Sequence, residues 1–199
     1  IDEAINTLML VEKSNLFYPK SKLMLAELLT ESSREELAIK HLRDLIDNDT
    51  GSFEVYEALG NAYRHRENFE LAEIAYSDAL VANTHSDFEN KKLWLIYFFR
   101  GIAREQLDNY EQSMMDLRKA LEFVPEQPQV LNYLGYMLIE RRENLDEALG
   151  MIKLAVKQSP ESGYIVDSLA WGLYQLGRYH EAIVPMEKAI SLEPEDPIV

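Results

Sequence analysis

Apolar residues recur along this chain at intervals of three and four positions, the spacing that places them on one face of an α-helix. Ile1, Ile5 and Leu8 already follow it, and it returns in the stretches LMLAELL, EALGNAY, FFRGIAR, NYLGYML and DSLAWGL. Short polar segments separate the apolar stretches, and Gly177 in one of them suits a left-handed helix end. The pattern predicts an all-α chain of short amphipathic helices.

Small residues recur with a period near 34 residues, which indicates an internal repeat. Each apolar stretch has a central Gly or Ala, at positions 26, 60, 101, 135 and 170, and a second small residue follows twelve or thirteen positions later, at 38, 72, 113, 148 and 182. Small residues let two helix backbones approach closely. Pro125, Pro160 and Pro194 would end the second helices, whereas Pro185 lies within one and is expected to kink it.

The register predicts antiparallel helix pairs that tile the chain as one solenoid. Residues 1–18 form the second helix of a partial repeat, residues 87–93 an insertion, and residues 197–199 the start of a further repeat. The predicted full repeats are 19–52, 53–86, 94–127, 128–162 and 163–196. The chain therefore begins and ends within a repeat.

This pattern resembles the tetratricopeptide repeat family, whose signature places a large residue, Leu-Gly, Tyr, Ala, an aromatic residue, Ala and Pro at fixed offsets. Repeat 53–86 matches it at Tyr56, Leu59, Gly60, Tyr63, Ala72, Tyr76 and Ala79. Repeat 94–127 departs from it at Arg100, Arg104 and Ser113. The resemblance implies an all-α, right-handed superhelical solenoid of antiparallel helix pairs. Segment 131–192 is also similar to paired repeats in exported, envelope-associated bacterial proteins of this family, which favours the envelope over the cytoplasm.

The charge, the absence of cysteine and the short apolar runs of this sequence argue against several classes of function. The chain has 20 Lys and Arg against 35 Asp and Glu, a formal charge of −15, which argues against nucleic-acid binding because phosphate contacts need clustered cations. The absence of cysteine excludes a disulfide scaffold, a thiolate zinc site and a cysteine nucleophile. The longest apolar run, Leu93 to Phe99, has seven residues, well below the roughly 18 that a membrane span needs, so no direct membrane insertion is expected.

No catalytic or metal-binding constellation stands out. The four histidines lie in different predicted helices or turns, without the HExxH spacing of a zinc site. The nucleophile elbow, the phosphate-binding loop and the dinucleotide-binding glycine pattern do not occur. The many carboxylates fit the solvated faces of amphipathic helices. We therefore expect no enzymatic activity, no metal and no cofactor in this chain.

The resemblance implies that the first helix of each repeat lines a concave groove, with helix positions 2, 5, 6, 9, 12 and 13 facing a bound peptide. Over the five full repeats these positions carry seven carboxylates and two strong cations, Lys20 and Arg64, a net charge of −5. The last three repeats add aromatic residues, a type enriched at interface hot spots. The candidate partner-binding residues are Asn61, Arg64, Phe98, Asn132, Tyr136, Tyr164, Asp167, Trp171 and Tyr174.

Aromatic residues at helical spacing also occur in cores, so Phe98, Phe99 and Tyr133 have packing between repeats as an equal alternative. Trp171, Tyr136 and Tyr174 are the stronger candidates for exposed contact. Some family members grip the carboxylate at a peptide's C-terminus with a Lys, Asn, Asn, Lys, Arg set. Only Asn61 matches that set, so we expect no such clamp.

An acidic, aromatic groove favours a protein or peptide partner that presents basic and apolar residues. The expected function is a non-catalytic scaffold or adaptor that binds a partner peptide or helix in this groove. The alternative is a substrate-docking accessory domain of a larger enzyme or of a secretion or assembly machine. Self-association through the terminal helices is a third possibility, because repeats at the ends of a solenoid expose apolar faces.

Overall fold

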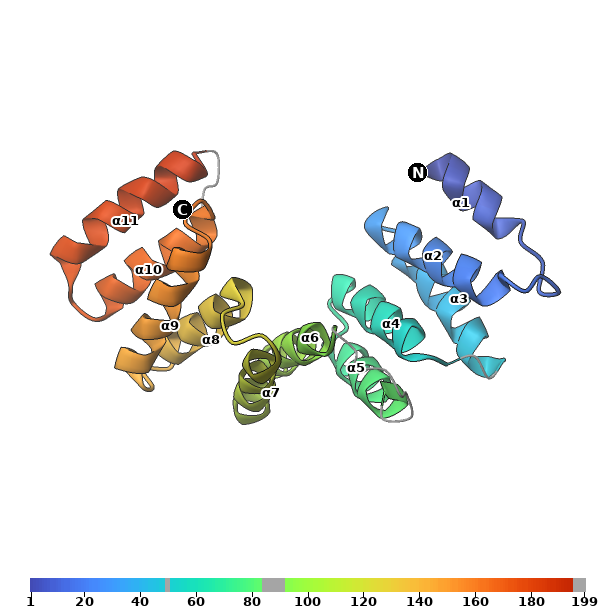
Figure 1. Ribbon diagram of the computed structural model, residues 1–199, viewed down its shortest axis with the longest axis horizontal. Helices are drawn as coiled ribbons and strands as arrows, with labels where there is room; N and C mark the ends of the chain where they lie inside the picture. The colour runs from blue at the N-terminus through green and yellow to red at the C-terminus, as the bar shows by residue number, and fades with distance from the viewer. Residues whose placement is uncertain (49–50, 84–91, 195–199) are drawn as a thin grey trace. The chain divides into compact units, whose positions relative to one another are not determined.

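The computed structural model describes residues 1–48, 51–83 and 92–194, and within these ranges it holds eleven α-helices and no strand (Figure 1). The helices are α1 (Asp2–Met9), α2 (Tyr18–Glu31), α3 (Glu35–Asp47), α4 (Phe53–His65), α5 (Phe69–Asn83), α6 (Leu93–Gln106), α7 (Tyr110–Phe123), α8 (Pro128–Glu140), α9 (Leu145–Gln158), α10 (Gly163–Gln175) and α11 (Tyr179–Leu192). None of these described helices has both the length and the apolar character needed to cross a bilayer.

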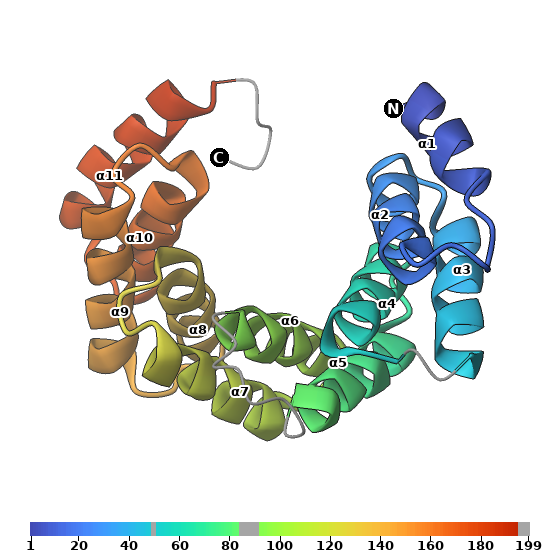
Figure 2. The same ribbon diagram turned by 45° about the vertical axis from the view of Figure 1, so that its right-hand side comes forward.

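Helices adjacent in sequence pack against one another within two compact units, Ile1–Asp116 and Leu117–Val199, whose boundary falls inside α7. In the first unit α2 packs on α3, α4 on α5 and α5 on α6. In the second unit α8 packs on α9 and α10 on α11, and both views show each pair running antiparallel (Figures 1 and 2). The predicted fold class, an all-α solenoid of antiparallel helix pairs, is confirmed.

One turn geometry closes the first helix of all five pairs. A residue with positive φ follows each of these helices, and the N–H of the next residue donates to a carbonyl four positions before the turn residue, as from Arg178 to Leu173 at 2.9 Å. The positive-φ residues are Ser33, Glu67, Asp108, Arg142 and Gly177. Gly177, with φ +72°, confirms the predicted left-handed position. A second left-handed residue, Asn144, lengthens the turn between α8 and α9.

Close contact within the pairs depends on small residues. A Cβ added to Gly60 of α4 would lie 2.5 Å from the ring of Tyr76 in α5. A Cβ added to Gly135 of α8 would lie 2.7 Å from the Ile152 side chain and 2.9 Å from the Ala148 carbonyl oxygen of α9. Real Cβ atoms do not come this close to other atoms. Glycine at these two positions is therefore required by the packing of the pairs.

Some predicted boundaries fall outside the described residues. The predicted insertion 87–93 is described only at its last two residues, and α6 begins at Leu93. The predicted repeat start at 197–199 is outside as well. The repeat boundaries therefore stay predictions. Pro185 lies inside α11, which continues through it, and the neighbouring Ile183 and Val184 are exposed.

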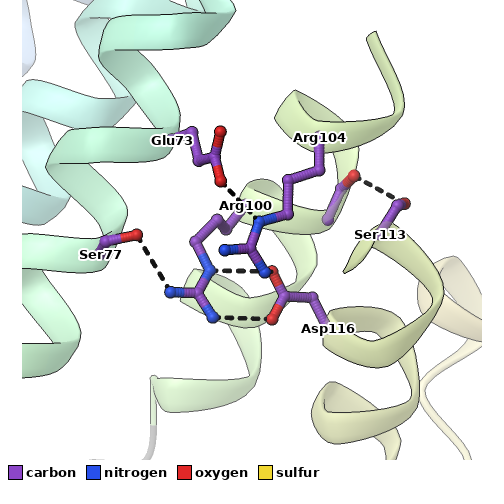
Figure 3. Close-up of polar contacts among 7 residues, drawn as sticks. Glu73, Ser77, Arg100, Arg104, Ser113 and Asp116 are labelled. Atoms are coloured by element: carbon purple, nitrogen blue, oxygen red, sulfur yellow. Dashed lines mark hydrogen bonds and ion pairs between the residues drawn. The ribbon is translucent and has the colours of Figure 1, made fainter. Parts of the chain in front are cut away.

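Two of the departures from the repeat signature, Arg100 and Arg104, form a buried ionic network in the first unit (Figure 3). Asp116 of α7 accepts two hydrogen bonds from Arg100 and a third from Arg104, all at 2.8 Å. Arg104 also donates to Glu73 of α5 at 2.8 Å. The Asp116 side chain is only 5% exposed, and the two arginines are 14% and 16% exposed. Two guanidinium groups thus balance two carboxylates at the contact of α5, α6 and α7.

Two serine hydroxyls near this network are also hydrogen-bonded. Ser77 of α5 accepts a hydrogen bond from Arg100 at 3.1 Å. Ser113, the third departure from the signature, is fully buried and donates to the Gly101 carbonyl at 2.8 Å (Figure 3). A buried hydroxyl with a hydrogen-bond partner avoids most of the desolvation cost of burial. Each of the three polar substitutions of this repeat therefore has a hydrogen-bond partner.

Gly135→Ala is expected to destabilise the second unit by about 1 to 3 kcal/mol, because the new methyl group overpacks the contact between α8 and α9. Gly150→Ala is the matched control: a Cβ at Gly150 of α9 meets nothing within 4 Å, so this change should be neutral or slightly stabilising. Urea denaturation followed by circular dichroism measures both. Equal stability of the two variants would contradict the close approach at Gly135.

Asp116→Asn is expected to cost about 3 kcal/mol or more, because it leaves two largely buried guanidinium groups with the single carboxylate of Glu73. The control is Glu147→Gln, which breaks the exposed ion pair with Arg118 (N to O distance 2.8 Å) and should cost at most about 1 kcal/mol. Thermal and urea unfolding compare the two. A cost at Asp116 no larger than that at Glu147 would show that the network does not stabilise the first unit.

Candidate functional site

An open pocket of about 330 Å³ lies on the first helices of the first unit. All six predicted groove positions of repeat 53–86 line it, together with three positions from α2, Lys92, and Phe99 from α6. We call this site the acidic pocket; its residues are Glu27, Thr30, Glu31, Glu54, Glu57, Ala58, Asn61, Arg64, His65, Lys92 and Phe99. Residues as far apart in sequence as Glu27 and Phe99 thus line one pocket.

Carboxylates outnumber cations in the acidic pocket. Glu27, Glu31, Glu54 and Glu57 face two cations, Arg64 and Lys92. Burial raises the pKa of Glu57, and the nearby charges of Glu27 and Glu54 raise it further, whereas Lys92 lowers it. The Lys92 ammonium lies 3.3 Å from the Glu57 carboxylate. Glu57 therefore carries a charge that its surroundings compensate only in part, and a further cation in the pocket would lower its pKa.

The floor of the acidic pocket is held by contacts within the protein. The buried Tyr76 hydroxyl donates to Asn61 Oδ1 at 2.8 Å. Burial raises the pKa of Tyr76 to about 12, and the nearby Arg64 charge opposes that shift. The Arg64 guanidinium lies 4.5 Å from the centre of the Phe99 ring, which itself stacks on Tyr76. Asn61 and Arg64 are thus fixed in orientation before any partner arrives.

Arg64 also has unused hydrogen-bonding capacity. Its Nε atom is buried and has no hydrogen-bond partner among the described residues. Such a donor is costly to leave unpaired. The side chain therefore lines the pocket with its positive charge held against Phe99 and with one buried donor unpaired.

A second surface lies in the second unit and is aromatic. The rings of Trp171 and Tyr174, both on α10, stack with centroids 5.7 Å apart and planes 19° apart. Tyr179, at the start of α11, follows at 5.2 Å from Tyr174. We call Trp171, Tyr174 and Tyr179 the aromatic stack. Tyr174 and Tyr179 are 51% and 60% exposed, so a large part of the stack is accessible to solvent.

Two carboxylates lie beside the aromatic stack. Glu140 of α8 accepts a hydrogen bond from the Trp171 indole N–H at 2.5 Å. Asp167 lies one turn before Trp171 on α10. Tyr136, one turn before Glu140, is 41% exposed, and its pKa is raised by burial and then by the charges of Glu140 and Asp167. Both carboxylates therefore act on the same part of the surface.

The structure distributes most of the predicted partner-binding residues over two separate surfaces. Asn61 and Arg64 lie in the acidic pocket, and Tyr136, Asp167, Trp171 and Tyr174 gather at the second surface. Tyr164 is also exposed, at 47%, and its backbone N–H donates to the Glu193 carboxylate at 3.2 Å. That any of these residues binds a partner stays a prediction.

Two candidates, Phe98 and Asn132, contribute little surface. Phe98 is 9% exposed and packs against Trp94 and Phe99, with ring centroids 6.4 and 5.4 Å apart, which follows the packing alternative. Asn132 is 7% exposed, and its Oδ1 has no hydrogen-bond partner among the described residues. Both side chains are therefore largely buried.

Sequence reasoning missed two contributors, Lys92 and Tyr179. Lys92 precedes α6 and so lies outside the first-helix positions that are expected to face a bound peptide. Tyr179 begins a second helix, whereas only first helices were expected to contribute. The short turn at Gly177 was the available signal, because it brings the start of α11 back beside the end of α10. Among the described residues, no three His, Asp or Glu side chains meet as a metal site.

Comparison with known proteins agrees with this fold. Sequence models described as tetratricopeptide repeat match residues 22–87, 96–126 and 168–196. The TPR repeat-containing protein PA4667 of Pseudomonas aeruginosa is 29% identical over 100 residues, half of this chain. The matched segment spans 17% of the length of that relative.

Two solved structures show the same fold at low sequence identity. A crystal structure of MamA has a TM-score of 0.72 and 16% identity, over 86% of this chain and 95% of that one. YrrB, described as a TPR protein with an unusual peptide-binding site, has a TM-score of 0.70 and 20% identity, over 98% and 95%. With the sequence models matching well over half of its residues, the chain belongs to the tetratricopeptide repeat family.

Proposed function

We propose that this chain is a non-catalytic scaffold whose acidic pocket binds a segment of a partner protein that carries lysine or arginine beside apolar residues. A tetratricopeptide repeat fold supports a general role in protein–protein interaction. The finer proposal rests on one observation: all six groove positions of repeat 53–86 line a single open pocket with four carboxylates.

The charges of the pocket favour a cationic partner. The Glu57 side chain is 13% exposed, and its ion-pair partner among the described residues is the exposed Lys92. A lysine or arginine from a partner would add a second counter-charge to Glu57 and would also attract the carboxylates of Glu27 and Glu54. A neutral or acidic side chain supplies no such opposite charge. An acidic segment would be repelled and would leave these carboxylates desolvated.

The fixed side chains give the pocket a second function, which is orientation of the bound chain. The Arg64 guanidinium and the Asn61 side chain are held by Phe99 and Tyr76 and can hydrogen-bond a peptide backbone without losing much side-chain entropy. YrrB, a structural neighbour, is described as having a peptide-binding site, which supports the same use of this fold here.

Charge reversal in the pocket tests the proposal. Immobilised protein with Glu31→Lys and Glu54→Lys is expected to recover partners from an extract of the native cell at least tenfold less well than the unchanged protein, because like charges at an interface cost several kcal/mol. Quantitative mass spectrometry measures recovery. An enzyme among the captured proteins would support the substrate-docking form of the function.

The control for this capture carries the same change of charge elsewhere. Glu70→Lys and Glu187→Lys alter exposed residues of the second helices α5 and α11 and should leave recovery unchanged. Circular dichroism verifies that both variants fold. Equal recovery by the pocket variant and the control variant would refute binding at the acidic pocket.

Glu57→Gln is expected to stabilise the protein slightly at pH 7, with a gain that shrinks as the pH falls toward 4. The folded state raises the pKa of Glu57, so folding favours the protonated carboxyl and the wild type loses stability as the pH rises through that pKa. Glutamine does not titrate and lacks this loss. Urea unfolding at several pH values measures the difference, and a gain that grows toward low pH would contradict it.

A further inference from the structure

The aromatic stack is a surface whose orientation the protein fixes from two sides. The Trp171 indole N–H donates a hydrogen bond to Glu140 of α8, with 2.5 Å between Nε1 and Oε1, and Tyr174 stacks on the Trp171 ring. Tyr179, which follows the turn at Gly177, also packs on Tyr174, with ring centroids 5.2 Å apart and planes tilted by 57°. Both ribbon views show α10 and α11 side by side (Figures 1 and 2). The rings form a preformed platform.

This platform is exposed and lies beside negative charge. Tyr174 and Tyr179 leave about half or more of their surface in solvent. Glu140 is bonded to the indole of Trp171, and Glu140 and Asp167 both act on the neighbouring Tyr136 hydroxyl. The face of an aromatic ring attracts cations through its quadrupole, and nearby carboxylates add to that attraction. The chemistry therefore selects a cation.

The protein itself covers other aromatic rings with cations. Five rings in the described residues lie under a lysine or arginine of the chain, among them Phe99 under Arg64 at 4.5 Å and Tyr97 under Arg100 at 5.5 Å. The three rings of the aromatic stack are not among these five. Arg178, which precedes Tyr179, is bonded to Glu181 at 2.6 and 2.7 Å and is thereby engaged.

We infer that an arginine side chain of a partner protein lies against the Trp171–Tyr174 face of the aromatic stack, with its guanidinium within reach of Glu140. A planar guanidinium stacks on aromatic rings while donating to a carboxylate, which a compact ammonium does less well. This inference builds on the proposed function, because it adds a second contact point on the same scaffold. It depends on residues of the second unit alone.

The test uses a small probe of defined charge. The tripeptide acetyl-Gly-Arg-Gly-amide is titrated into ¹⁵N-labelled protein while the Trp171 indole N–H is followed by NMR, its signal being identified by its loss in Trp171→Phe. The probe in which citrulline replaces arginine has nearly the same shape without the charge. The arginine probe is expected to bind at least threefold more tightly than the citrulline probe. The lysine probe should bind more weakly than the arginine probe.

Matched variants of Tyr174 distinguish a contribution of its aromatic ring to binding from a contribution of apolar volume alone. Tyr174→Phe keeps the ring and should bind the arginine probe as the unchanged protein does. Tyr174→Leu removes the ring and should weaken binding at least threefold. Glu140→Gln retains an acceptor for the Trp171 indole but removes the charge, and it should also weaken binding. Circular dichroism confirms that each variant folds.

The outcomes are decisive. Equal binding of the arginine and citrulline probes, tighter binding of the lysine probe, or no change in the indole signal with any probe would each overturn the inference. Capture of a partner that depends on Glu31 and Glu54 but is unchanged by Tyr174→Leu would refute this contact and leave the acidic pocket standing. Arginine binding at the stack without any pocket-dependent partner would refute the proposed function instead.

Discussion

The close approach of two helix backbones within each pair is the constraint on which the rest of this structure depends. At Gly60 and Gly135 the partner helix occupies the space that a side chain would need. Larger residues such as Tyr76 and Ile152 fill the volume around the glycines and are fully buried. A left-handed residue after each first helix returns the chain so that the second helix meets these small residues. The exposed faces of the first helices are then free to vary.

Repeat 94–127 shows that the contact between helices can also be ionic. Arg100 and Arg104 converge on Asp116, and Glu73 supplies the second carboxylate. Burying charge is costly, but here each guanidinium group makes hydrogen bonds and the charges of the four groups cancel. Because guanidinium forks bond in fixed directions, such a network orients its four side chains relative to one another, whereas apolar contacts are less directional.

The two candidate surfaces differ in chemistry, although both lie mainly on first helices. The acidic pocket combines four carboxylates with fixed donors from Asn61 and Arg64. The aromatic stack combines exposed rings with the carboxylate of Glu140. Both surfaces are suited to cationic side chains, and the large negative charge of the chain extends the same preference to longer range. Residues that packing does not require are the ones that give these surfaces their character.

The sequence alone determined the helices, their pairing and the turns, because these follow from the spacing of apolar and small residues within a few turns of the chain. It also identified Tyr136 and Tyr174 as exposed, and two further candidates, Asn61 and Arg64, line the acidic pocket, although binding by any of them stays a prediction. The tertiary structure decided that Phe98 and Asn132 are covered, that Lys92 and Tyr179 join the surfaces, and that Arg100 and Arg104 share Asp116. The periodicity of one helix fixes which face a residue occupies, whereas its exposure and its partners depend on side chains that neighbouring helices bring to that face.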